Sequence, residues 1–193
     1  MSERDLNIDE ANLHQFIHDV GSLKRKDRAG WIRHAVEQPE SVAEHSFRAG
    51  IMAFVLAPSF GLDPNKCMKM AIFHDLGEHS IPDYTPFDNI TREQKHREEE
   101  EAMRTLCSKI PNGDEVLGLW QEFEEGETAE AKLVRGIDRL EMMFQAEEYA
   151  REQPTKDLEL FWEMSQESHF GELFSVYEAL RIRRTITPSK KDV

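Results

Sequence analysis

Apolar side chains recur along this chain with the three- and four-residue spacing of amphipathic helices. The first such group, Leu13, Phe16, Ile17 and Val20, follows the i, i+3, i+4, i+7 pattern, and Gly21 stands where a helix C-cap is expected. We find no convincing alternation of polar and apolar residues with the period of two that is typical of half-buried strands. The pattern therefore predicts an all-α fold.

Capping signals predict where the later helices begin. The segment from Ser41 to Glu44 has the form of a capping box, so a helix should start at Val42 and carry His45 in its first turn. Asp63 followed by Pro64 predicts a further helix that runs toward Leu76 and ends at Gly77. The irregular segment after it, Gly77–Ile90, is long enough to indicate a functional loop.

The second half of the chain repeats the helical spacing. A helix should open at Thr91 and stop before Pro111, and two more fit between Lys156 and Arg184. The longest predicted helix spans about Ala129 to Glu152, and its apolar stripe consists of Leu133, Ile137, Leu140 and Phe144. We expect one domain over residues 1–185 and a short C-terminal tail over residues 186–193.

Composition places the chain among globular proteins. Its 193 residues are 39% hydrophobic and 32% charged, long enough to bury a core without disulfides. No stretch approaches the roughly 18 apolar residues of a membrane span, and the first residues lack the apolar core of a signal peptide. Cys67 and Cys107 form no CxxC pattern, which favours reduced thiols and a cytoplasmic location.

The net charge of −14 argues against binding to nucleic acid polymers or anionic membranes. It leaves room for a small anionic substrate, because five basic residues are concentrated in a stretch of ten residues that lies shortly before His45. They are Lys24, Arg25, Lys26, Arg28 and Arg33. A solvated basic loop is the alternative interpretation of this group.

A histidine–aspartate pair is the strongest candidate for chemistry. His74 and Asp75 follow the apolar run MKMAIF, so we expect both to be buried on a helix, where an unpartnered carboxylate is costly. With His45 upstream and Asp138 downstream they predict a site for a divalent cation, since imidazole and carboxylate suit first-row metals and magnesium. A satisfied core pair is the alternative. Asp138, at the margin of an apolar stripe, is either exposed or directed into a pocket.

These residues also occur in segments that resemble a known family. The order His45, His74-Asp75, Asp138, with PESVAEHS and HDxxE motifs and an AEAKxVxxxDxxEMxxQAxEY-like stretch, resembles the HD-domain 5'-deoxynucleotidases. The resemblance implies an HD-type helical bundle with the metal site in its centre and a homodimer. It also implies that a divalent cation (Co, Mn, Mg, Fe or Zn) is held by these four residues, and that deoxyribonucleoside 5'-monophosphates are hydrolysed to deoxynucleosides and phosphate.

The same resemblance assigns roles to residues around the metal. Glu78 would take part in proton transfer, Asp83 would lie at the catalytic and substrate site, and Arg28 and Trp31 would contact the nucleotide. Arginine and tryptophan are separated here by Ala-Gly, whereas some family members have them adjacent, and an ordinary core position is the alternative for Trp31. Asp88 also matches the family, as a second-metal or substrate contact.

Two other functions fit the same motifs. One is an HD hydrolase of another phosphorylated nucleotide, such as guanosine tetraphosphate or a cyclic nucleotide. The single-domain length and the HDLGEHSIPD segment argue against it. The other is a metal-stabilised nucleotide-binding module without turnover, which Glu78 next to an intact ligand set disfavours.

Overall fold

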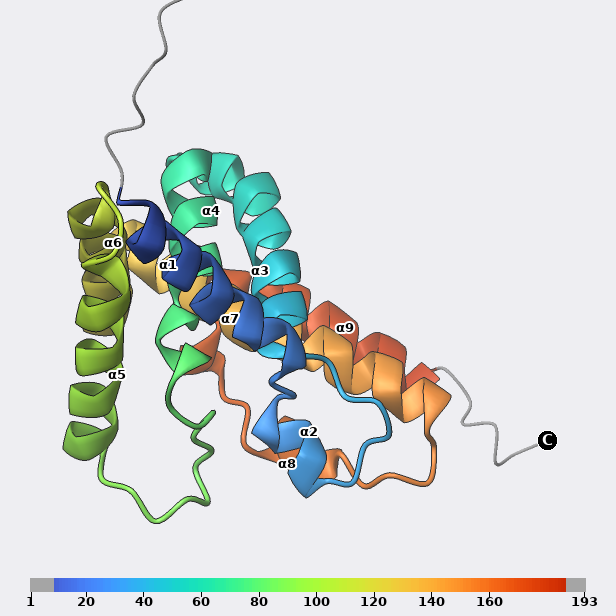
Figure 1. The fold of residues 1–193 in the computed structure, drawn as a ribbon. Helices are drawn as coiled ribbons and strands as arrows, with labels where there is room; N and C mark the ends of the chain where they lie inside the picture. Colours follow the sequence, from blue (N-terminus) through green and yellow to red (C-terminus); the bar gives the residue numbers. More distant parts are fainter. Residues whose placement is uncertain (1–8, 187–193) are drawn as a thin grey trace, which may run out of the picture.

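The structure of the protein, a computed structural model, describes residues 9–186 and is built from helices joined by loops (Figure 1). In this described part, extended backbone pairs only at an isolated antiparallel bridge between Asp27 and Ser41. The predicted all-α fold is confirmed. Of the predicted tail, residues 187–193 lie outside the described residues, and residue 186 is the last of helix α9.

The helices are joined by loops and 3₁₀ turns, and a long connection leads from α4 to α5. The α-helices are α1 Glu10–Ser22, α2 Ala29–Arg33, α3 Val42–Leu56, α4 Pro64–Phe73, α5 Arg92–Cys107, α6 Gly113–Glu125, α7 Ala129–Glu152, α8 Glu159–Glu163 and α9 Phe174–Ile186. Single 3₁₀ turns occur at Leu23–Arg25, Ala57–Phe60, Leu76–His79, Glu167–His169 and Gly171–Leu173.

Helix α7 is the centre of the bundle. It contacts α3, α4, α6 and α9, and Figure 1 shows it passing behind α1 through the middle of the molecule. Its inward face contributes Ile137, Leu140 and Met143, which have no exposed surface. The boundaries predicted for this helix are confirmed, and Thr128 caps its start by accepting a hydrogen bond from the amide of Ala131 at 3.2 Å.

Helix α3 begins as its capping box predicts. Ser41 Oγ accepts from the amide of Glu44 at 3.2 Å, and Glu44 Oε2 accepts from the amide of Ser41 at 2.7 Å. The helix then packs closely on α4. A Cβ added at Gly50 would lie 2.8 Å from Cγ1 of Ile72, so a larger residue here would force the Ile72 side chain or the helices to shift.

The prediction for the first helix is wrong in one respect. Helix α1 continues through Gly21 to Ser22 and leads directly into the 3₁₀ turn that starts at Leu23, so Gly21 does not cap it. The helix lies on the surface, where Ile17 is 60% exposed, and the buried residue that anchors this region is Leu23. No helix among the described residues is long and apolar enough to cross a membrane.

Candidate metal centre

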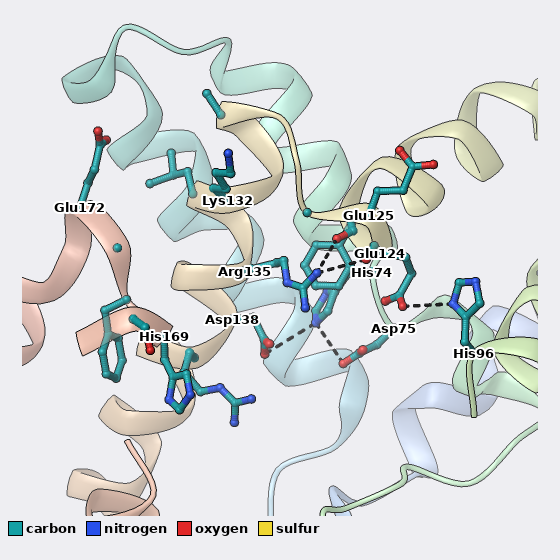
Figure 2. Close-up of a pocket in the computed structure, with 18 of the residues that line it drawn as sticks. His74, Asp75, His96, Glu124, Glu125, Lys132, Arg135, Asp138, His169 and Glu172 are labelled. Atoms are coloured by element: carbon teal, nitrogen blue, oxygen red, sulfur yellow. Dashed lines mark hydrogen bonds and ion pairs between the residues drawn. The ribbon is translucent and has the colours of Figure 1, made fainter. Parts of the chain in front are cut away.

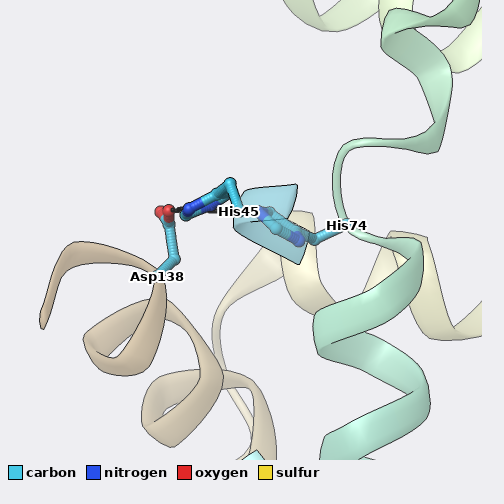
Figure 3. Close-up of side chains that lie close together, drawn as sticks. All are labelled: His45, His74 and Asp138. Carbon is cyan, nitrogen blue, oxygen red and sulfur yellow. Dashed lines mark ion pairs between the residues drawn. The ribbon is translucent and has the colours of Figure 1, made fainter. Parts of the chain in front are cut away.

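Four of the predicted residues converge between α3, the end of α4 and α7. Nε2 of His45 lies 3.1 Å from Oδ1 of Asp138, and Nε2 of His74 lies 3.0 Å from Oδ2 of Asp75. Each imidazole is 3.9 Å from the other carboxylate. His45, His74 and Asp138 each offer a ligand atom, all within 4.8 Å of one another, and Figure 3 shows the three side chains meeting.

The two imidazole rings present lone pairs to this centre. Nδ1 of His74 lies 2.7 Å from the carbonyl oxygen of Ala71, and Nδ1 of His45 is hydrogen-bonded to Oε2 of Glu141. With protons on both Nδ1 atoms, the Nε2 atoms are left as acceptors, and both are buried without a hydrogen-bond partner. Lone pairs facing carboxylate oxygens repel one another unless a cation lies between them. The donor set of two imidazoles and two carboxylates therefore fits a divalent metal ion.

The backbone at His74 and Asp75 corrects the predicted helix end. Helix α4 stops at Phe73, His74 is its C-cap, and Asp75 has left the helix with φ −105° and ψ 12°. Successive side chains on a regular helix diverge by about 100°. The break after His74 lets two consecutive residues face one centre instead.

Gly77 serves packing and does not end α4. It lies inside the 3₁₀ turn Leu76–His79, where an added Cβ would be 3.3 Å from Cγ of Met103 and 3.4 Å from the carbonyl oxygen of Glu99. This close contact with α5 sets the position of the turn that follows Asp75, and therefore of Glu78 within it.

Charge balance keeps the carboxylates of the centre ionised. Burial opposes the charge of Asp75, but His74 and Arg28 beside it outweigh this effect and hold its pKa below the usual value. The pKa of Asp138 is also lowered, since contacts with His45 and His74 outweigh its burial. Burial and the charge of Arg28 disfavour a protonated His45, yet the adjacent carboxylates of Asp138 and Glu141 raise its pKa to about 9. A metal ion bound at this centre would therefore compete with a proton for the same position on this ring.

Glu78 has the opposite environment. Its side chain is 5% exposed and its Oε2 has no hydrogen-bond partner. Burial, followed by the negative charges of Asp75 and Asp83, raises its pKa well above the usual value. Lys26 Nζ donates to the carbonyl oxygens of Glu78 and Ile81, which holds the turn in place. Glu78 is thus a carboxylic acid poised to carry a proton.

The predicted substrate residues lie on the other side of Asp75. Nη1 of Arg28 is 3.3 Å from Oδ2 of Asp75, and Oδ2 of Asp83 accepts from the amide of Ala29 at 2.7 Å. Trp31 is 1% exposed and its Nε1 donates to Oε1 of Glu40 at 2.9 Å. Its indole is a core side chain at the wall of a cavity, and its contact with a nucleotide stays a prediction.

Asp88 braces the loop that follows the centre. Its Oδ2 accepts from the amide of Thr85 at 2.6 Å and from the Thr85 hydroxyl at 2.7 Å, and its Oδ1 accepts from Arg33 at 3.0 Å. The Arg33 guanidinium also lies 5.2 Å from the centre of the Phe87 ring. These contacts give Asp88 a structural role, and a second-metal or substrate contact stays a prediction.

Two cavities of about 1270 and 680 Å³ meet at Asp75 and Asp138. The smaller one is lined by Arg28, Trp31, Glu78 and Asp83, and the larger one, shown in Figure 2, opens past His74 toward α6. The cavities also share four basic residues that sequence reasoning missed. These are Arg92, Lys95, Arg139 and His169.

A partial signal existed for these missed residues. Arg139 follows Asp138 directly, and Lys95 lies in the helix that starts after the Gly77–Ile90 loop. Their approach to the centre depends on how α5 and α7 pack, which spacing along the chain does not encode.

Comparison with known proteins agrees with this geometry. Residues 20–174 match the family model described as HD domain. The chain is 44% identical over 140 residues to 5'-deoxynucleotidase HDDC2 of Bos taurus, covering 72% of this chain and 68% of that protein. It is 36% identical over 177 residues to 5'-deoxynucleotidase HDDC2 of Danio rerio, covering 90% and 88%.

A solved structure gives the same result for the fold. The crystal structure of PH0347 protein from Pyrococcus horikoshii OT3 superposes with a TM-score of 0.72 at 30% identity and covers 90% of this chain and 99% of that one. A family match over most of the chain and a bundle of the same shape lead to one conclusion: the chain belongs to the HD-domain family.

Proposed function

We propose that the protein is a metal-dependent 5'-deoxynucleotidase, which hydrolyses deoxyribonucleoside 5'-monophosphates to deoxynucleosides and phosphate. The observation that carries the proposal is the pair of unpartnered Nε2 atoms of His45 and His74, which face two carboxylates beside the buried Glu78. Curated relatives from animals and fungi that bear the name 5'-deoxynucleotidase support the choice of substrate.

The metal site would be formed by His45, His74, Asp75 and Asp138. When bound, a divalent cation neutralises phosphoryl oxygens and lowers the pKa of water, which overcomes the repulsion between a phosphate dianion and its nucleophile. The donor set of nitrogen and carboxylate oxygen admits Co, Mn, Fe, Zn or Mg.

Side chains of the protein would perform the remaining steps. Arg28 offers a planar donor fork to the phosphate oxygens, and the carboxyl of Glu78 supplies a proton to the leaving O5' alkoxide. Asp83, whose Oδ2 accepts from the amide of Ala29, ties the loop bearing it to α2, and its negative charge helps raise the pKa of Glu78. Arg92, Lys95 and Arg139, which line both cavities, add cationic side chains to a site that also contains carboxylates, in a chain of net charge −14.

The competing functions have less support. An HD hydrolase of guanosine tetraphosphate or cyclic nucleotides would not account for the shared name of the curated relatives. A binding module without turnover does not require a buried Glu78 with a raised pKa beside the ligand set.

A phosphate-release assay tests the proposal. Nucleoside mono-, di- and triphosphates are supplied with each of the five metals, and 3'-monophosphates and aryl phosphates serve as controls. Deoxyribonucleoside 5'-monophosphates should be turned over and the controls should be poor. A metal-loaded protein that hydrolyses no 5'-monophosphate would favour the binding module.

We further propose a homodimer formed through the outer face of α3. Four large apolar side chains on this face are exposed: Phe47 68%, Ile51 50%, Phe54 46% and Val55 64%. Their i, i+4, i+7, i+8 spacing forms one continuous stripe, which an isolated chain would leave in water. Light scattering should give twice the chain mass, and Phe47→Glu should yield monomers; a monomeric parent would contradict the proposal.

We also propose a cytoplasmic location and no binding to nucleic acid polymers. The free, buried thiols of Cys67 and Cys107 and the strongly negative net charge support these two points.

A further inference from the structure

Both ring nitrogens of His45 face helix α7. Nε2 lies 3.1 Å from Oδ1 of Asp138, and Nδ1 is hydrogen-bonded to Oε2 of Glu141. Asp138 and Glu141 are three residues apart, so they lie on the same face of the helix, one turn from each other. Helix α7 therefore contributes the candidate metal ligand Asp138 and also binds the ring nitrogen of His45 that points away from the centre.

Glu141 is fully buried, with no exposed surface. A buried carboxylate is tolerated only where its oxygens are paired. Its second oxygen, Oε1, accepts from Nε of Arg48 at 2.7 Å, and Nη2 of Arg48 lies 2.6 Å from the same atom. Each oxygen of Glu141 thus has one fixed partner, His45 on one side and Arg48 on the other.

Arg48 is itself held by the same helix. It lies three residues after His45 on α3, and its guanidinium donates to Oε1 of Gln145 at 2.6 Å and to Oε2 of Glu148 at 2.7 Å. Successive residues of α3 and α7 therefore pair in register, from the centre outward to the half-exposed Glu148.

We propose that Glu141, held by Arg48, is a positioning residue of the metal centre. By accepting the Nδ1 proton it fixes the His45 tautomer whose Nε2 lone pair points at the metal, and its negative charge makes the imidazole a stronger ligand. Glu141 itself does not reach the centre, because its oxygens are taken by the ring and by Arg48. The inference rests on the metal part of the proposed function and is independent of the substrate.

Another interpretation of the same residues is a second ion site. Glu40, His45 and Glu141 bring ligand atoms within 4.8 Å of one another, and all three are buried. However, Nδ1 of His45 and Oε2 of Glu141 already share a hydrogen bond, and Oε1 of Glu40 accepts from Trp31. A hydrogen bond between His45 and Glu141 therefore takes the position that an ion would need, and Glu40 is engaged by Trp31.

Metal affinity tests the assignment directly. Metal-free protein is titrated with Zn²⁺ or Mn²⁺ in competition with a chromogenic chelator, and the unfolding temperature of the metal-free protein is recorded separately. Glu141→Ala should bind metal about 10- to 100-fold more weakly. Glu141→Gln should lose less, because its amide oxygen still accepts the Nδ1 proton.

Glu148→Gln is the matched control, since it bonds the same arginine without touching His45. It should keep wild-type affinity within about twofold. If Glu141→Ala has a lower unfolding temperature with wild-type metal affinity, Glu141 is merely structural and the inference is overturned. A loss of metal affinity in Glu148→Gln equal to that in Glu141→Ala would also overturn the inference. If Glu141→Ala fails to fold, wild-type metal affinity in Glu141→Gln would overturn it instead. A wild-type protein without metal affinity would instead remove the proposed function.

Discussion

Nη1 of Arg28 lies 3.3 Å from Oδ2 of Asp75, so the residue predicted to bind phosphate also touches a candidate metal ligand. A cation in this position partly offsets the charge of Asp75, and in the proposed function it would draw an anionic substrate toward the metal. Arg28 links the two parts of the site.

Arg28→Ala should therefore separate substrate binding from metal binding. We expect kcat/KM to fall about 10- to 100-fold, the cost of a charge-assisted phosphate contact of about 1.5–3 kcal/mol. Metal content should be unchanged, because Asp75 loses a competing cation. Arg28→Lys, which keeps the charge without the fork, should be intermediate. Unchanged kcat/KM in the alanine variant would exclude Arg28 from phosphate binding.

Metal removal should destabilise the fold. A ligand at 100 times its Kd adds about 2.7 kcal/mol to the free energy of unfolding, so a chelator should lower the unfolding temperature by about 5–10 °C. Replacing the metal should restore it. His74→Ala should already behave like the chelated protein and contain no metal; a metal content equal to wild type would refute the ligand assignment.

Glu78→Gln should separate proton transfer from metal binding. The amide has the shape of the carboxylic acid but cannot supply a proton, so turnover should fall about 100- to 10,000-fold while metal content stays at the wild-type level. Asp138→Ala should lose metal and turnover together. Full turnover in Glu78→Gln would reject the proposed acid, and loss of metal would identify Glu78 as a ligand.

The turn beneath Glu78 should be sensitive to a single methyl group. Gly77→Ala places a Cβ 3.3 Å from Met103 and 3.4 Å from the backbone of Glu99, which we expect to cost about 1 kcal/mol of stability and to lower turnover by moving Glu78. Gly21→Ala is the control. Apart from the adjacent residues and the backbone of its own helix, no atom lies within 4 Å of the new Cβ, and alanine in this helix should add about 0.5–1 kcal/mol to the free energy of unfolding. Thermal unfolding and kcat are measured on both variants, and an unchanged kcat in Gly77→Ala would show that this glycine does not position Glu78.

Sequence patterns predicted the structure best where the interacting residues are close together in the chain. The capping box at Ser41 and Glu44 placed the start of α3 correctly, because both groups act within one helical turn. The predictions based on Gly21 and Gly77 were wrong because the role of each glycine depends on its surroundings in the fold. A glycine followed by irregular sequence is typical of a helix end, but the first continues a surface helix and the second makes room for α5.

In the candidate site, too, the sequence indicated the ligand residues but not the contacts that depend on packing. A pattern of His45, His74, Asp75 and Asp138 is visible along the chain, and the structure brings these residues together. The support of His45 by Glu141 joins residues 96 positions apart, and no periodicity in either helix specifies that contact. It depends on the register between α3 and α7, which only the packed core determines.

The helix break between Phe73 and Asp75 bears on how such centres can be built anew. A designer who writes histidine and aspartate side by side into an uninterrupted helix obtains one inward ligand and one that points away. Both residues of the motif can face the same centre only where the backbone leaves the helix at the second residue, as it does here at Asp75 with φ −105° and ψ 12°. A search for protein scaffolds that could hold such a centre should therefore match the backbone angles at a helix terminus before it matches the His-Asp pair in the sequence.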